Sequence, residues 1–229
     1  MKKVLILAYE FPPYVSVGGF RPYSWFKYMP EFGIKPIVIT RQWENKYNNT
    51  LDYVAPSIKK TIIVEETNNR TLIKVPYFPN ISNKILLKFG EKKFRMIRKL
   101  ISGYYEFIQF IFPYGPKIEI FKAANEYLKN NKVDYILPTG DPFILFHYAS
   151  KLGNKYNTPW IADYRDPWSH DISKQNILLN FWSRYYEKKI VNKAEFIVTV
   201  SEFIKHQINS IIPNKKIHII TNGYDSEIL

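Results

Sequence analysis

The stretch VLILAYEFPPYVSVGGFRPYSWFKYMPEFGIKPIVIT, residues 4–40, decides the fold. It opens with the apolar run VLILAY (4–9), passes through a loop rich in proline and glycine, and closes with the apolar run PIVIT (36–40). Between the two runs, large apolar side chains recur at helical spacing over residues 21–32, and Gly33 follows as a helix terminator. Continuous apolar runs are typical of strands that are covered on both faces. The stretch therefore predicts a strand–helix–strand unit.

The rest of the chain keeps alternating between strand-like and helix-like segments. The segment 61–75 predicts two strands around a turn, and further strands are expected at 133–139, 159–164, 196–200 and 216–221. Helices are expected at 117–131, 142–156, 177–194 and 202–210, with Asp141 and Ser201 as N-caps, and residues 83–112 have a helical period interrupted by Gly90 and Gly103. This alternation predicts an α/β fold in which one domain is built on a doubly wound, mostly parallel, Rossmann-like sheet.

Composition narrows the class of protein. With 229 residues, of which 46% are hydrophobic and 17% aromatic, the chain can bury one good core. It contains no cysteine, which excludes disulfides, thiolate catalysis and cysteine metal sites and fits a reducing compartment. No segment reaches the ~20 apolar residues that span a bilayer, and the first apolar run is too short for a signal peptide. We therefore expect a cytoplasmic protein, either soluble or peripheral on the inner membrane face.

The charge balance points to a polyanionic neighbour. The formal net charge is +13, which suits nucleic acid, an anionic membrane surface or phosphorylated ligands, unless it reflects a general compositional bias. Residues 83–99 hold one acidic residue and seven basic ones beside a rough apolar stripe, for a net charge of +6. A basic amphipathic helix can lie on anionic lipid, and the alternative is a crossover helix with a solvated basic face. The seven basic residues are Lys84, Lys88, Lys92, Lys93, Arg95, Arg98 and Lys99.

Polar, loop-forming motifs follow the expected strands. They read EFPPYVSVGGFR, TGDP, DYRDPWSHD, SEF and TNGYD in chain order. In an open α/β sheet the ligand crevice lies beyond the carboxyl ends of the parallel strands. These motifs are therefore expected to meet at the mouth of the sheet, where they would form one binding cleft.

The densest of these motifs carries the candidate catalytic residues. The functional interpretation is that Asp163 or Asp166 is a carboxylate that accepts a proton or binds sugar hydroxyls, with Arg165 or Trp168 shaping the pocket. The alternative is an internal ion pair in which Arg165 only fixes the loop. We expect both aspartates to face the cleft, within reach of Gly19 and Arg21.

A glycine pair and several histidines are further candidates for functional residues. Gly18 and Gly19 precede the first expected helix, where exposed amides attract anions and Arg21 adds charge, although a structural glycine turn explains them as well. His147 lies inside a helix and is expected to be structural. The pair at 170–171 imitates a metal or acid–base site, but without HxxxH or HExxH spacing no metal site is predicted.

The ordered set EFPP, VGGFRP, TGDPF, DYRDPW, VTVSE and ITNGYD resembles a known family. The sequence is similar to the N-terminal, acceptor-side domain of family-four retaining glycosyltransferases of the GT-B fold, from residue 2 to residue 225. The resemblance implies a glycosyltransferase that moves a sugar from a nucleotide-sugar to a glycan or lipid-linked acceptor, as in polysaccharide biosynthesis. It implies no metal and no cofactor beyond the nucleotide-sugar substrate.

The resemblance also assigns roles to residues. Gly18 and Gly19 match the glycine loop that faces the donor and the acceptor. Arg165 stands where many relatives carry a histidine, which shifts the candidate base to Asp163 or Asp166. The remaining substrate-binding candidates, taken from the same strand ends, are Arg21, Asp141, Trp168, Ser201, Glu202 and Asn222.

The resemblance further divides the enzyme into domains. Residues 1–220 correspond to the N-terminal domain and 221–229 to the start of the interdomain hinge, so the donor-binding domain is expected outside this chain. Residues 1–229 alone are expected to fold without transferring sugar. The alternative is a basic nucleic-acid-binding α/β module, for which no known motif appears. A nucleotide-dependent dehydrogenase is excluded because the first loop lacks GxGxxG.

Overall fold

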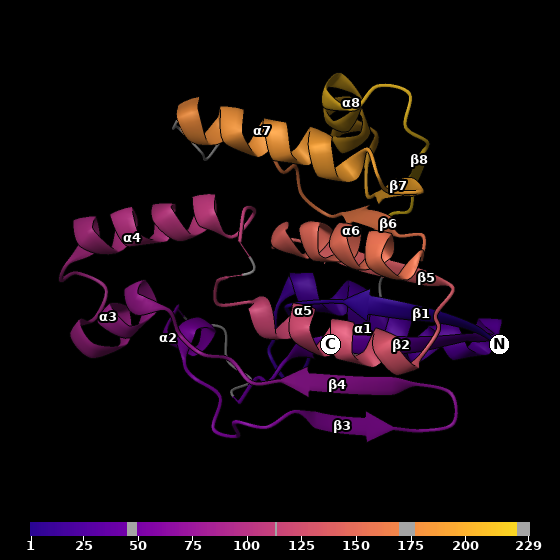
Figure 1. Cartoon of the computed structure of the whole chain (residues 1–229), viewed down its shortest axis with the longest axis horizontal. Coiled ribbons are helices and arrows are strands. Elements are labelled where there is room, and N and C mark those ends of the chain that lie inside the picture. Colours follow the sequence, from indigo (N-terminus) through magenta and orange to yellow (C-terminus); the bar gives the residue numbers. More distant parts are fainter. Residues whose placement is uncertain (45–49, 113, 170–176, 224–229) are drawn as a thin grey trace.

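The computed structural model describes residues 1–44, 50–112, 114–169 and 177–223, and an eight-stranded sheet runs through them (Figure 1). The strand order is β3-β4-β2-β1-β5-β6-β7-β8, and every neighbouring pair is parallel except β3 with β4. The α/β fold with a mostly parallel sheet is thus confirmed. The strands are β1 (Lys2–Leu7), β2 (Ile34–Arg41), β3 (Ile63–Glu66), β4 (Thr71–Val75), β5 (Tyr135–Gly140), β6 (Ile161–Tyr164), β7 (Phe196–Thr199) and β8 (Ile217–Ile219).

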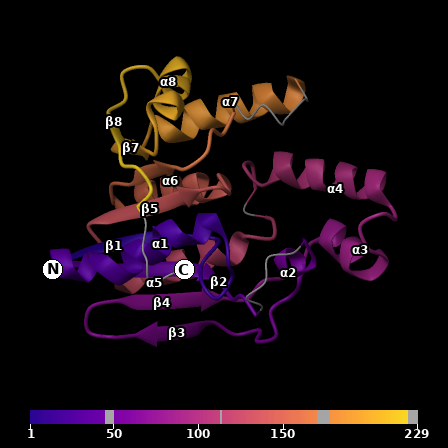
Figure 2. The same ribbon diagram turned by 180° about the vertical axis from the view of Figure 1, so that it is seen from behind.

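Helices connect the strands and cover both faces of the sheet. The α-helices are α1 (Val17–Tyr28), α2 (Thr50–Val54), α3 (Ile81–Phe89), α4 (Arg95–Ile108), α5 (Ile118–Asn130), α6 (Ile144–Tyr156), α7 (Ile177–Val191) and α8 (Glu202–Ile211), and a 3₁₀ helix, η1 (Met29–Phe32), follows α1. In β1, Leu5 and Leu7 belong to a core that includes side chains of α5 and α6, whereas Val4 and Ile6 pack with side chains of α1 on the other face. Figures 1 and 2 show these helices on opposite sides of the sheet.

The first helix begins earlier than the sequence predicts. The Ser16 hydroxyl accepts a hydrogen bond from the Gly19 amide at 2.9 Å and caps a helix that starts at Val17. Gly18 and Gly19 therefore lie in the first turn of α1, not in the loop before it. Gly33 ends η1 with a φ of 71°, a left-handed conformation that favours glycine.

The two predicted caps in the second half of the chain differ in outcome. Ser201 caps α8 as predicted, because its hydroxyl accepts from the Ile204 amide at 3.3 Å. Asp141 as a helix cap is wrong, since α6 begins only at Ile144 and Phe143, at its N-cap, makes no side-chain cap bond. The Asp141 side chain is thereby exposed at the end of β5.

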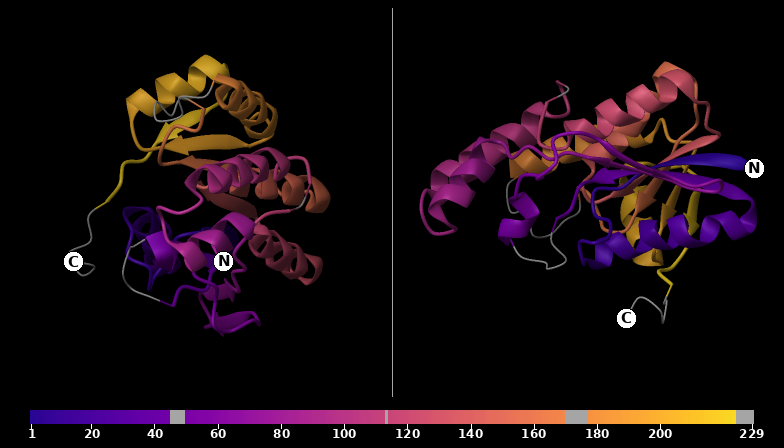
Figure 3. Two further views of the ribbon diagram at one scale, coloured as in Figure 1. Left: turned by 90° about the vertical axis from the view of Figure 1, so that its left-hand side faces the viewer. Right: turned by 90° about the horizontal axis from the view of Figure 1, so that it is seen from below.

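Helices α3 and α4 form a hairpin that projects beyond the sheet (Figures 1 and 3). Gly90 ends α3 with a φ of 76°, as its place in the sequence suggested, but Gly103 lies inside a continuous α4. In the part of the chain that the structure describes, no helix combines the length and apolar character needed to cross a membrane.

His147, on α6, is half-buried at the edge of the core and has a structural position, as its sequence context predicts. Its ring packs edge-on against Phe110, with centroids 5.8 Å apart, and its Nε2 atom is buried without a partner among the described residues. Burial lowers the pKa of His147 to about 4, and the positive charges of Lys151, Lys189 and Lys193 act in the same direction. The folded protein thus holds this imidazole neutral at pH values where the unfolded chain protonates it.

The first prediction concerns stability against pH. Because the folded pKa lies below the ordinary value of about 6.5, the stabilisation is present above pH 6.5 and is lost as pH falls toward 4. We expect about 3 kcal/mol of unfolding free energy to be lost in that range through this group. Urea unfolding at several pH values should show this slope reduced in His147→Leu and retained in the exposed control His206→Gln. An unchanged slope in His147→Leu would contradict the assignment.

Candidate functional site

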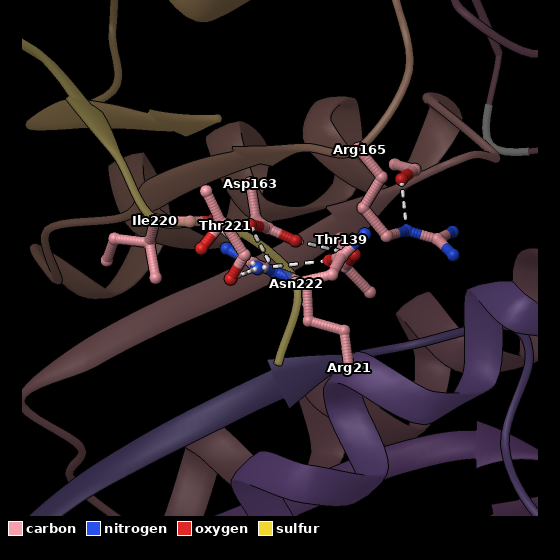
Figure 4. A network of polar contacts seen from close by, with 8 residues as sticks. Arg21, Thr139, Asp163, Arg165, Ile220, Thr221 and Asn222 are labelled. Carbon is pink, nitrogen blue, oxygen red and sulfur yellow. Dashed lines mark hydrogen bonds and ion pairs between the residues drawn. The ribbon is translucent and has the colours of Figure 1, made fainter. Parts of the chain in front are cut away.

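The guanidinium of Arg21 ties three parts of the fold together at the mouth of the sheet (Figure 4). From α1, its Nε donates to the Asp163 carboxylate on β6 at 3.0 Å. Its Nη1 donates to the carbonyl of Ile220 at 3.0 Å and, at 3.4 and 3.3 Å, to the Thr221 carbonyl and the Asn222 side-chain oxygen. Arg21 therefore fixes the course of the chain after β8, which Figure 2 shows descending toward α1.

Asp163 lies inside the protein and not in a cleft. Its exposed fraction is 0%, and its second oxygen accepts from the Thr139 hydroxyl at 2.8 Å. The parallel register sets Thr139 directly beside Asp163 on the neighbouring strand, which explains this bond. Burial raises the pKa of the Asp163 carboxyl, and the charge of Arg21 and the hydrogen bond from Thr139 oppose that rise. The predicted proximity to Arg21 is confirmed, and the predicted orientation toward a cleft is wrong because the ion pair holds the carboxylate inward.

Arg165 fixes a different loop. Its Nε donates to the Gly140 carbonyl at 2.7 Å and its Nη2 to the Asp141 carbonyl at 2.9 Å. The alternative interpretation of this motif, an internal ion pair of Arg165 with its neighbouring aspartates, does not hold among the described residues, because the guanidinium of Arg165 is directed to backbone oxygens. A side chain at Gly18 would meet the Arg165 Nη1 and the Glu10 carboxylate at 2.3 Å each, so either it or these two side chains would have to move.

A cavity of about 270 Å³ opens next to this loop. Its walls come from α2, the end of α4, the start of α6 and α7, which meet beyond the carboxyl ends of β1 and β5. The predicted residues Asp141 and Trp168 both line it. The other lining residues are Tyr53, Glu106, Gln109, Phe110, Lys117, Pro142, Phe143, Ile144, Trp182 and Ser183. The cavity thus combines aromatic walls with a few polar and charged groups.

Trp168 is a wall of this cavity because its neighbours hold it rigidly. Its ring stacks on Phe143 with centroids 5.1 Å apart and an interplanar angle of 1°, and on Phe110 at 5.6 Å. The loop that carries Trp168 is held by the buried Glu187 carboxylate, which accepts from the Tyr164 hydroxyl at 3.0 Å and from the Ser169 amide at 3.1 Å.

The remaining predicted residues do not gather in that cavity. Asp166 is exposed on the loop after β6, and Ser201 and Glu202 begin α8. Arg21 and Asn222 line a separate depression of about 210 Å³ that also contains Trp25. Of the predicted residues, two therefore line the first cavity, two line the second depression, and the others line neither. The histidine–aspartate pair at 170–171 lies outside the described residues, and in the described part no group of three His, Asp or Glu side chains is placed to hold a metal ion.

Several residues of the site escape sequence reasoning. Tyr53, Lys117 and Trp182 reach the cavity from three segments, none of which carries a polar strand-end motif. Arg41 is buried, and the central carbon of its guanidinium lies 3.7 and 4.0 Å from the ring centroids of Tyr77 and Trp43. No local sequence pattern predicts this contact. In the sequence, only the high aromatic content is a general indication of aromatic walls around a cavity.

Comparison with known proteins decides the family. The model of Glycosyltransferase Family 4 matches residues 90–228, which include the TGDP, DYRDPW, VTVSE and TNGYD motifs. The chain belongs to Glycosyltransferase Family 4. Among the curated proteins, no sequence matches it.

Solved structures show the same fold for this Glycosyltransferase Family 4 chain. Sucrose-phosphate synthase from Thermosynechococcus elongatus matches 100% of the chain with 14% identity and a TM-score of 0.60. The catalytic domain of starch synthase IV from Arabidopsis thaliana matches 99% with 13% identity and 0.54, and UGT2 from Phytolacca americana 99% with 7% identity and 0.51. The chain spans about half the length of these structures, 50%, 52% and 53% respectively, which identifies its fold with one half of a GT-B glycosyltransferase.

The second prediction concerns the ion pair of Arg21 with Asp163. Removing either partner alone leaves the other buried without its counter-charge, so Arg21→Met and Asp163→Leu should each destabilise by about 3–5 kcal/mol. The double variant should lose clearly less than the sum of the two, because no uncompensated charge remains. Chemical denaturation measures all three, with Lys122→Ala and Glu119→Ala, an exposed pair at 2.7 Å, as a control expected to couple by less than about 1 kcal/mol. Strict additivity at Arg21 and Asp163 would disprove the coupling.

Proposed function

We propose that this chain is the acceptor-binding domain of a retaining glycosyltransferase that moves a sugar from a nucleotide-sugar to a glycan or lipid-linked acceptor. The observation that carries the proposal is the aromatic cavity beyond the strand ends, with the Asp141 carboxylate at its edge. Ligand sites are concave and largely apolar, with few polar groups that fix orientation. Sugar rings have apolar faces and hydroxyl edges, which fit aromatic walls and the polar groups of Glu106, Gln109 and Lys117.

The two aspartates of the DYRDPW motif take different roles in this proposal. Asp163 is a positioning residue, since its carboxylate is buried and bonded to Arg21 and Thr139. Asp166 is exposed on the same loop and is the carboxylate that contacts the reacting sugars or accepts a proton. Arg165 holds the Gly140–Asp141 backbone at the cavity, and Gly18 and Gly19 face the donor.

The donor is bound mainly by groups outside residues 1–229. A departing nucleoside diphosphate requires preorganised cationic or hydrogen-bonding groups in the transition state. In the described residues, Arg21 donates through Nε and Nη1 and Arg165 through Nε and Nη2 to protein oxygens, which leaves Lys117 as the cation that lines the cavity. The starch synthase IV structure, which contains ADP and acarbose, is matched over 52% of its length, and this is consistent with a donor site shared with a second domain.

A kinetic comparison tests the acceptor site. In the full-length enzyme, Asp141→Asn should raise the KM for the acceptor about tenfold and leave the KM for the donor unchanged, because one charged hydrogen bond to an acceptor hydroxyl is lost. In the same assay, Asp166→Asn should lower kcat by about 100-fold without unfolding the domain. The matched control is Glu195→Gln, an exposed carboxylate just before β7 at the opposite edge of the sheet. An acceptor KM unaltered by Asp141→Asn, or wild-type turnover in Asp166→Asn, would refute the respective role.

A binding experiment tests whether the donor is bound mainly by groups outside residues 1–229. Residues 1–229 alone should fold cooperatively, bind UDP-, GDP- and ADP-sugars no better than millimolar, and transfer no sugar. Titration calorimetry against that panel measures the affinity, and the absence of turnover is checked with the full-length enzyme as the positive control. Micromolar donor binding by residues 1–229 would place the donor site within this domain and disprove the proposal.

A further inference from the structure

Helix α4 exposes a row of large apolar side chains. Met96, Leu100 and Tyr104 follow one another at a spacing of four residues and are 81%, 74% and 59% exposed. Ile97, beside them, is 49% exposed. Residues four apart lie on the same face of a helix, so these side chains form one apolar ridge. Contiguous exposed apolar surface of this kind marks a contact site for another partner or for a membrane.

The ridge is flanked by positive charge that the protein does not neutralise. The seven basic residues of 83–99 all lie on the α3–α4 hairpin, and none of them forms an ion pair with a carboxylate among the described residues. The guanidinium of Arg98 donates to the Glu91 carbonyl, and these two residues border an open notch together with Lys92 and Arg95. The notch therefore presents three cationic side chains and one carboxylate to an external ligand.

The hairpin reaches away from the body of the domain (Figures 1 and 3). At its turn, Phe89 and Phe94 contact edge to face, with centroids 5.0 Å apart, and both remain partly exposed at 39% and 48%. The turn, the ridge and the basic residues thus lie on one projecting element, which can meet a flat surface before the rest of the domain does.

We propose that the α3–α4 hairpin is a docking element for an anionic lipid surface. The apolar ridge inserts at the boundary between headgroups and acyl chains, and the basic side chains bind the lipid phosphates. Charge selects this occupant over a second copy of the chain, because each copy carries +13 and two such hairpins repel one another. The most exposed side chains of the ridge, Met96 and Leu100, are aliphatic, whereas a nucleic-acid site stacks bases on aromatic side chains beside its charges.

The docked position has a consequence for the cavity. Glu106 lies in the last turn of α4, and Gln109 and Phe110 follow directly, so the helix that carries the ridge also supplies one wall of the 270 Å³ cavity. If the chain is the acceptor domain proposed above, docking sets its cavity beside the membrane, where a lipid-linked acceptor is held. Lipid binding itself does not depend on that function and can be measured without any transfer reaction.

Vesicle sedimentation of the 229-residue chain tests the proposal. The probes are vesicles of phosphatidylcholine alone and of phosphatidylcholine with phosphatidylglycerol, at low and at physiological salt. We expect binding to the anionic vesicles only, weakening as salt rises. The charge-reversal variant Lys92→Glu/Lys93→Glu/Arg95→Glu should lower the partition coefficient by on the order of 100-fold or more. Met96→Gln/Leu100→Gln should also weaken binding, and at high salt its loss should persist, because it removes apolar insertion and not charge.

The matched control reverses the same number of charges elsewhere. Lys2→Glu/Lys132→Glu/Lys216→Glu changes three exposed lysines at the opposite, amino-terminal edge of the parallel sheet. It should retain most of the anionic binding, because the hairpin is intact. Equal sedimentation with both vesicle types, or equal losses in the control and the hairpin variants, would overturn the proposal. So would vesicle-independent self-association or binding of single-stranded DNA that the hairpin reversal alone abolishes.

Discussion

The burial of one guanidinium constrains the mouth of this domain. Arg21 projects from α1 into a place where water is excluded, and its charge is acceptable there only because Asp163 and several oxygens of the segment after β8 surround it. Those partners all lie far from Arg21 in the sequence, 142 residues away for Asp163 and 199 to 201 residues away for the segment after β8. These contacts link distant segments: the chain after β8 returns to α1, and β6 ends with its carboxylate turned inward.

A second set of contacts shapes the mouth around that pair. Gly18 has no side chain, so α1 can approach both Arg165 and the Glu10 carboxylate closely. Arg165 in turn holds the backbone at Gly140 and Asp141, which sets one border of the aromatic cavity. A charged framework thus positions the loops, and the cavity itself is lined largely by rings. The DYRDPW motif, the most charged of the sequence, therefore contributes to the cavity through the ring of Trp168 and not through its aspartates.

The basic residues near the carboxyl ends of the strands differ from those of the α3–α4 hairpin in whether the protein neutralises them. The cations near the strand ends are neutralised or bonded internally, as Arg21 and Arg165 are, whereas those of the α3–α4 hairpin have no acidic partners in the described residues. Positive charge that is neutralised or hydrogen-bonded inside the protein fixes the positions of its partner segments. Positive charge that is exposed to solvent attracts external anions. The two groups of basic residues therefore have different physical roles, although the sequence alone does not distinguish them.

The sequence by itself determined which segments form strands and helices. The spacing of apolar residues that burial imposes, every two positions in a strand and every 3.6 in a helix, is a local property of the sequence. The strand at 4–9, the hairpin of β3 with β4 and the Ser201 cap were predicted from such local signals, and the motifs at strand ends correctly indicated the family. Only the tertiary structure decided that Asp163 points inward, since its partner Arg21 lies 142 residues away and no local pattern couples them. The same holds for the cavity, whose rings converge from α2, α7, the segment after α4, the segment before α6 and the loop after β6. Contacts between distant segments depend on how helices pack on the sheet, and that packing is fixed by the whole fold, not by any one stretch of residues.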